Sequence, residues 1–166
     1  MPKIDLVLSE KGIDDAISQL QAYAEKIRQA PEKIVRSLTM DGQAAASGRL
    51  SSIADPDGNI DARVSSQVNG RKGTVSLSGS QAAFLEFGTG PVGGSQPHPL
   101  SGQAGWKYAS GPKIRTFKNG RIGWVYFDRS KHHYRITSGI APQNIMLSAA
   151  ERMRMNIVQR AKEALK

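Results

Sequence analysis

The residues best able to do chemistry in this chain are a pair of histidines and a scattered set of serines. His132 and His133 are adjacent, so on a strand they would face opposite sides and on a helix they would lie about 100° apart. Neither arrangement suits a metal ion, and no carboxylate cluster stands at ligand spacing beside them. No serine lies in a Gly-x-Ser-x-Gly turn. We therefore expect no metal, no cofactor and no catalytic residue, and the sequence predicts a protein that is not an enzyme.

A glycine-rich segment could in principle cradle a phosphate. Gly88-Thr89-Gly90 is followed by Gly93-Gly94, but no Gly-Lys-Ser/Thr follows these glycines. Residues 88–112 are instead rich in Gly, Pro, Ser and Gln, with a few aromatic side chains among them. A loop of about 25 residues inside a compact domain is uncommon and usually functional or disordered. We expect a long loop that is flexible or becomes ordered against a partner.

The most specific stretch, residues 80–90, leads into that loop. It is too apolar for a surface loop and too short for an independent helix, so we expect it to be buried against another element, capping or continuing a sheet. Glu86 lies inside the apolar cluster, and burying an unpaired carboxylate is costly. We expect Glu86 to meet a cation or backbone amides. Gly88 and Gly90 are expected at positive φ.

The net charge of +9 is unevenly distributed. Residues 113–166 carry twelve Lys or Arg against three Asp or Glu, whereas the rest of the chain is balanced. A basic third of this kind favours nucleic acid, an acidic protein or a negatively charged surface as partner, or else it is a solvated face. Aromatic side chains are interleaved with the cations from Trp106 onward. They could stack on nucleic acid bases, or form the core of a hairpin whose cations face water.

Periodicity predicts mixed secondary structure in a single domain, residues 1–166. Residues 4–8 alternate as a short opening strand does, and residues 13–30 and 32–53 have helical spacing. We expect Pro31 to separate these two helices. The glycines and alanines at 42–48 let another backbone approach, within the fold or across a subunit boundary. A third helix is expected to follow Pro142 and run almost to the end of the chain.

Two hairpins are expected between these helices. Residues 63–68 and 74–78 flank Asn69-Gly70, and residues 113–117 and 121–127 flank Lys118-Asn119-Gly120. Asn-Gly favours the turns that match the twist of paired strands. Residues 128–138 are polar and basic, and no element is assigned to them. The predicted fold class is α+β, with the helices packed on a small antiparallel sheet and the long loop and second hairpin inserted.

Composition excludes several other classes of protein. The chain of 166 residues has no cysteine, so disulfides, thiolate nucleophiles and zinc-thiolate sites are excluded. No apolar run is long enough to cross a membrane, and the N-terminus lacks the pattern of a signal peptide. We expect the protein in the cytoplasm of the cell that makes it.

The whole pattern resembles the tail-completion, or head-tail joining, proteins of long-tailed bacteriophages, which are small neck and minor tail components. The resemblance is carried by the two N-terminal helices, by the segment from Ala82 to Gly90, and by residues 141–146. The segment from Ala82 is similar to the family's aromatic, Glu, Phe, Gly, Thr motif. Residues 141–146, Ala-Pro-Gln-Asn-Ile-Met, are similar to the family's proline-led start of a C-terminal helix, but Gln143-Asn144-Ile145 stands where the family has an aromatic.

The resemblance implies an α+β virion protein without enzymatic activity. It implies a ring of copies, six in number, at the top of the tail tube, with the connector, tail terminator and tail tube proteins as partners and DNA nearby. No membrane and no small-molecule substrate is implied. We expect Phe84, Leu85, Phe87 and Pro142 to support the fold. The expected partner or oligomer interface consists of Phe84, Leu85, Glu86, Phe87, Gly88, Thr89, Trp106, Tyr108, Arg115, Lys118, Arg121, Arg129, Lys131 and Arg135.

Two other classes of function compete with this interpretation. The first is a free nucleic-acid-binding protein that uses the aromatic and basic C-terminal third, although no known nucleic-acid-binding module is visible. The second is a hydrolase acting in the long loop, for which the sequence offers no acid and base pair. Salt-sensitive binding of nucleic acid would favour the first alternative.

Overall fold

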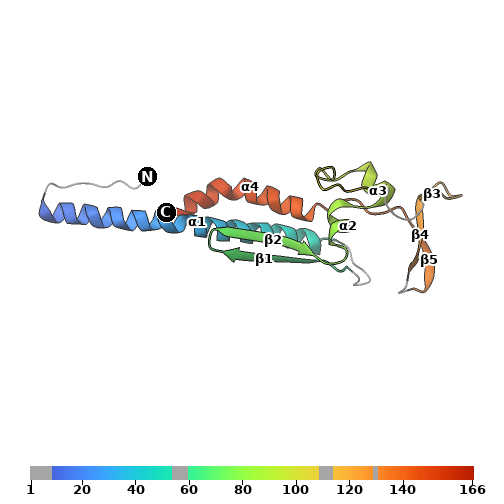
Figure 1. Cartoon of the computed structure of the whole chain (residues 1–166), viewed down its shortest axis with the longest axis horizontal. Helices are drawn as coiled ribbons and strands as arrows, with labels where there is room; N and C mark the ends of the chain where they lie inside the picture. The colour runs from blue at the N-terminus through green and yellow to red at the C-terminus, as the bar shows by residue number, and fades with distance from the viewer. Residues whose placement is uncertain (1–8, 54–59, 109–113, 129–130) are drawn as a thin grey trace.

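A computed structural model of the chain describes residues 9–53, 60–108, 114–128 and 131–166. This part is an elongated α+β structure with four helices and two small antiparallel sheets (Figure 1). The predicted fold class is confirmed at this level, whereas the strand expected at residues 4–8 lies outside the described residues. No described helix is both long enough and apolar enough to cross a membrane. The elements are α1 (Glu10–Ser51), β1 (Arg63–Asn69), β2 (Lys72–Ser78), α2 (Ala82–Phe87), α3 (Gly90–Ser95), β3 (Arg115–Thr116), β4 (Ile122–Asp128), β5 (His133–Thr137) and α4 (Ile145–Ala164).

Helix α1 is one continuous helix of 42 residues, so the prediction of two helices is wrong. It begins at Ser9, whose hydroxyl accepts a hydrogen bond from the Gly12 amide at 3.1 Å. Pro31 lies inside the helix. An internal proline removes one hydrogen bond, here the bond to the carbonyl of Ile27, which lies on an exposed turn where water can replace it. The apolar spacing continues on both sides of Pro31, and this continuity favours a single helix.

The hairpin β1–β2 is confirmed, with Arg63 opposite Ser78 and Asn69 opposite Lys72. Gly70 adopts a φ of 56° in the turn, as Asn-Gly turns require. The hairpin lies along the C-terminal half of α1, where Ser66 donates a hydrogen bond to Gln43. Gly73 lies directly against Thr39, and no side chain would fit there. The β1–β2 hairpin therefore packs against the C-terminal half of α1 and does not run along the whole length of this helix (Figure 1).

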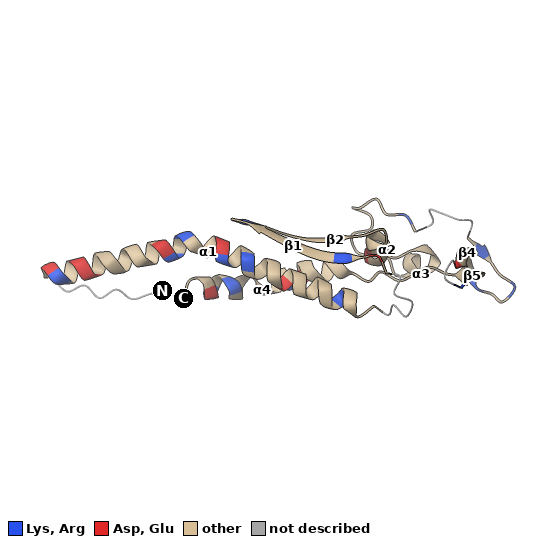
Figure 2. Cartoon of the chain, turned by 90° about the horizontal axis from the view of Figure 1, so that it is seen from below, with Lys and Arg blue, Asp and Glu red and all other residues tan. Residues whose placement is uncertain are grey.

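Helix α4 packs antiparallel to α1 on another side from the hairpin (Figures 1 and 2). Gly42 allows the close approach, because a Cβ there would lie 2.9 Å from the sulfur of Met153. The small-residue face of α1 thus serves the fold of one chain at Gly42 and Ala46, and it is not free for a neighbouring subunit there. The fully buried cluster at this contact comprises Ala46, Leu85, Ile145 and Ala149.

The second sheet, β3–β4–β5, lies at the opposite end of the molecule from the start of α1 (Figure 1). The predicted second hairpin is confirmed, with Arg115 opposite Gly123. Strand β5 was not predicted, because residues 133–137 are polar and gain their strand conformation by pairing with β4, Trp124 opposite Thr137. The sheet is joined to the rest of the chain by a bridge between Thr89 and Ile140.

Candidate functional site

The centre of the candidate site is the short helix α2, at the junction between the α1–α4 pair and the second sheet. The predicted burial of this stretch is confirmed for Leu85, which enters the core cluster, and for Glu86, which is 6% exposed. It is wrong for Ala83 and Phe84, which are exposed because they lie on the side of α2 that faces the pocket described below. The stretch does not continue the first sheet as expected, because it forms a helix of its own. Gly88 ends that helix with a φ of 75°, and Gly90 follows with 62°, as predicted.

The carboxylate of Glu86 caps the start of α4. Its Oε2 accepts a hydrogen bond from the Met146 amide at 2.7 Å, and its Oε1 accepts one from the Leu147 amide at 3.1 Å. The first amides of a helix have no partner inside the helix and carry its positive dipole end. The residue before the helix, Asn144, is left-handed and forms no side-chain cap. The expectation that Glu86 meets backbone amides is therefore confirmed.

The second partner of Glu86 is a buried histidine. His98 Nε2 lies 3.1 Å from Glu86 Oε1, and both side chains are almost fully buried. His98 Nδ1 accepts a hydrogen bond from the Leu100 amide at 3.0 Å. Since Nδ1 is an acceptor, Nε2 carries the proton and donates it to the carboxylate. This pair fastens the loop that follows α3 to α2 and α4, and its donors and acceptors are satisfied.

Aromatic rings assemble around α2. Phe87 stacks on Trp106 with ring centres 5.3 Å apart, and Phe84 meets the same indole edge-on at 5.7 Å. The indole nitrogen of Trp106 donates a hydrogen bond to the Gly88 carbonyl at 3.0 Å, which fixes the ring plane. Tyr108 accepts a hydrogen bond from the His98 amide through its hydroxyl. Residues 90–108, in the segment expected to be a long loop, thus form α3 and a set of contacts to α2 within the same chain.

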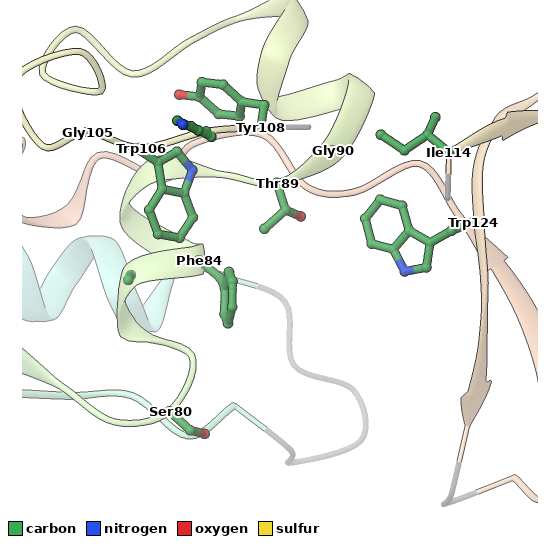
Figure 3. Close-up of a pocket in the computed structure, with 11 residues that line it drawn as sticks. Ser80, Phe84, Thr89, Gly90, Gly105, Trp106, Tyr108, Ile114 and Trp124 are labelled. Carbon is green, nitrogen blue, oxygen red and sulfur yellow. The ribbon is translucent and has the colours of Figure 1, made fainter. Parts of the chain in front are cut away.

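Between this cluster and the second sheet lies a pocket of about 740 Å³ (Figure 3). Phe84, Trp106 and Tyr108 line one side, and Ile114 and Trp124 reach it from the sheet. Gly90 lets the Trp124 ring approach closely, because a Cβ there would lie 2.5 Å from it. Pockets of this size with mostly apolar walls bind apolar groups. The arrangement suits a bulky apolar side chain or a short segment of another protein.

The described basic residues predicted for the interface do not line the pocket; they lie on and around the second sheet, which forms its far side (Figure 2). Arg115 lies over the ring of Phe117 at 5.8 Å. Arg135 pairs with Asp128 at 3.1 Å, and Lys131 donates its amide to the same carboxylate. Lys118 occupies the turn between β3 and β4, and Arg121 precedes β4. Arg129 lies outside the described residues. The predicted interface is thus two regions, an aromatic pocket and a basic sheet.

The sequence interpretation left several residues of the site out of the predicted interface, among them His98 beside Glu86, and Ile114 and Trp124 in the pocket lining. A signal for His98 existed, since a glutamate inside an apolar cluster needs a donor, and His98 is the one histidine in residues 88–112. Ile114 and Trp124 line the pocket because the second sheet is placed next to α2, and the local sequence does not predict this placement. Leu85 and Glu86 belong to the buried support of the site and do not form its surface.

Among the described residues, no group of three His, Cys, Asp or Glu is placed to hold a metal ion. Asp41, on α1, has its pKa lowered by hydrogen bonds from Arg160, and it braces two helices far from the pocket. No family model, no curated protein and no solved structure matches this chain.

Proposed function

We propose that this protein is a structural component of a tailed bacteriophage, acting without catalysis at the joint between head and tail. In this role several copies form a ring, six in the simplest case, at the neck or the top of the tail tube. The aromatic pocket receives a side chain of a neighbouring neck or tail protein, such as the connector, the tail terminator or the tail tube. The protein is made in the host cytoplasm and ends in the virion.

The observation that carries the proposal is the position of the pocket. The segment that resembles the phage family, from Phe84 to Thr89, supplies one wall and is held rigid by the buried Glu86–His98 pair. Phe84 nevertheless remains 48% exposed at the pocket mouth. A rigid base that presents an exposed aromatic ring beside an apolar hollow is typical of a protein–protein anchor point.

Removing the gene from the genome that encodes it tests the proposal directly. Electron microscopy of the resulting particles should show DNA-filled heads and separate tails, with few joined virions. Heads with normally attached, functional tails would exclude a role in joining.

A point variant then tests the pocket itself. Phe84→Glu places a charge at the pocket mouth, and we expect infectious particle yield to fall at least about a hundredfold when this variant replaces the wild type. Val158→Glu is the matched control, because Val158 is an exposed apolar residue on α4, outside the pocket. Equal yields from the two variants would show that the pocket is not the contact.

A second candidate function is nucleic-acid binding by the second sheet. Tyr134 is 74% exposed, packs edge-on against Phe127 at 5.2 Å, and is followed by Arg135. Exposed rings beside cations are the features on which bases stack. This alternative predicts DNA binding that weakens steeply with salt and is reduced by Tyr134→Ser. Fluorescence anisotropy with a labelled single strand measures both effects, and no binding at moderate salt would reject it.

A further inference from the structure

The first part of α1, residues 10–30, extends beyond the end of α4, and we call it the arm (Figure 1). Lys26 marks the limit of α4, since its Nζ donates a hydrogen bond to the carbonyl of Lys166. Along the arm Ile13, Ile17, Leu20 and Ile27 are 46%, 47%, 53% and 48% exposed. An arm of this length spans about 30 Å, and a helix of a folded protein normally buries its apolar stripe.

The spacing of these residues is that of a coiled coil. Ile13, Ile17, Leu20, Ala24 and Ile27 are separated by alternating steps of four and three, so they form a single straight seam. The same steps continue through Ile34, Leu38, Asp41 and Ala45. There the seam is covered by α4, whose Arg160 and Asn156 bind Asp41. Ala16 and Ala30, on another face of the arm, are buried, whereas the seam from Ile13 to Ile27 is the exposed continuation of a contact that α1 makes with α4 at Asp41.

We propose that a second copy of this chain covers the arm, through an antiparallel pairing of the two arms. A parallel pairing would bring both α4 helices onto the same continuous seam, where they would collide. In the antiparallel arrangement each arm occupies the part of the seam that the other chain's α4 leaves free. The start of one arm then meets the end of the other chain's α4.

One register satisfies both the apolar and the charged positions. With Leu20 opposite Ala24 of the second copy, Ile17 lies opposite Ile27 of that copy. On the flank of the same seam Asp14 then lies opposite Arg28 of the second copy, and the twofold symmetry makes two such ion pairs. Gln21 lies next to its own symmetry mate. This match between opposite charges is the reason for choosing a second copy over an unrelated partner.

The helix ends are complementary as well. Glu10, Asp14 and Asp15 lie near the start of the arm, where acidic groups are favourable for the helix dipole. Lys162 and Lys166 lie at the end of α4. Antiparallel pairing brings the acidic start of one arm to the basic end of the other chain's α4. The contact is isologous and closes on two copies, so a ring would have to use other surfaces, such as the aromatic pocket.

Single cysteines test the pairing cleanly, because the natural chain has none. Gln21→Cys should be joined to its twin by a cross-linker of about 8 Å, whereas Ala22→Cys, on the far side of the arm, should not. Ile13→Cys reports direction, because its twin lies about 27 Å away along the antiparallel pair and beside it in a parallel pair. Efficient joining of Ile13→Cys, or equal joining of Gln21→Cys and Ala22→Cys, would overturn the proposal.

Sedimentation equilibrium of the full chain measures the energetics. We expect a dimer for the wild type, with Leu20→Lys raising its dissociation constant at least about a hundredfold. Asp14→Arg and Arg28→Asp should each weaken the dimer about tenfold, and combining them should restore most of the loss. Ala22→Glu serves as the control and should leave the dimer intact. A chain that stays monomeric at all concentrations, or a dimer indifferent to Leu20→Lys, would refute the contact.

This inference concerns the free chain and does not depend on a role in a virion. Normal particles from a genome without the gene would reject the proposed function and leave the arm pairing untouched. A protein that stays monomeric in solution would reject the arm pairing and leave the proposed function in the virion unaffected.

Discussion

The two halves of α1 have the same repeat and opposite surroundings. Residues 31–51 are covered by α4 and by the first hairpin, and Ala46 there is fully buried. In the arm, the seam residues Ile13, Ile17, Leu20 and Ile27 are about half exposed, although Ala16 and Ala30 on another face are buried. Both halves use the same steps of four and three. The difference shows that apolar periodicity predicts that a helix face will be covered, without saying whether the cover comes from the same chain.

The largest effect on this contrast should come from Glu86, which caps the helix that covers the second half of α1. Glu86→Ala leaves the His98 imidazole and two amides of α4 without their acceptor. We expect the free energy of unfolding, measured by urea denaturation, to fall by about 3–5 kcal/mol, because the remaining groups of the buried network lose their hydrogen-bond acceptor.

Glu86→Gln refines this test, because the amide keeps one acceptor oxygen and should cost only about 1–3 kcal/mol. The NH2 group of the glutamine side chain cannot accept the hydrogen bond that the second α4 amide donates to the carboxylate in the wild type. Wild-type stability for Glu86→Gln would contradict the role of the carboxylate as a helix cap.

The next prediction compares the loss of stability caused by a leucine-to-alanine substitution in each half of α1. Leu50→Ala removes a side chain that packs against the core cluster, and we expect a loss of about 2 kcal/mol. Leu20→Ala lies on the exposed arm and should change the stability of the monomer by less than about 0.5 kcal/mol. Denaturation at concentrations low enough to keep the chain monomeric measures both. Equal losses would mean that the arm is covered within one chain.

The smallest effect concerns the ion pair that joins the covered half to α4. Arg160 donates to both carboxylate oxygens of Asp41, at 2.7 and 2.9 Å, and holds the pKa of Asp41 below its ordinary value of 3.8. A lowered pKa in the folded state gives stability that is present above pH 4 and lost as the pH falls through the folded pKa. We expect Asp41→Asn to lose about 1.5 kcal/mol at pH 7.

Stability measured at acidic pH separates the contribution of the Asp41–Arg160 ion pair from the contributions of other contacts. The difference in unfolding free energy between wild type and Asp41→Asn should shrink steadily below pH 4, when each is measured by urea denaturation. Glu25→Gln is the control in the arm, where Glu25 pairs with Arg28 in solvent, and it should show almost no difference at any pH. A constant gap for Asp41→Asn would assign its effect to packing.

Local patterns predicted those parts of the fold that depend on neighbours in sequence. The Asn-Gly turn at residues 69–70, the hairpin around residues 118–120 and the stripe of α4 are all recovered. Pro31 misled the prediction, because the local cost of a proline is outweighed by a seam that runs through both halves of the helix. Strand β5 was missed because its stability comes from β4 and its own polar residues give no alternation of apolar and polar side chains.

The site was predicted in part for the same reason. The buried state of Leu85 and the need of Glu86 for donors followed from their neighbours. Which donors serve Glu86 did not, because the His98 imidazole and the α4 amides are brought there by tertiary contacts. The aromatic and basic residues were grouped together by sequence, whereas the structure separates them into a pocket and a sheet.

The capping of α4 by a residue of α2 makes the last helix depend on contacts between residues far apart in the sequence. Because Asn144 provides no side-chain cap, α4 depends on the carboxylate of Glu86, which is synthesised much earlier. The contact of Asp41 with Arg160 likewise joins residues 119 positions apart. Non-local contacts of this kind slow folding. During synthesis the part of the α1 seam that α4 contacts stays exposed until this last helix leaves the ribosome, whereas the seam of the arm stays exposed afterwards as well.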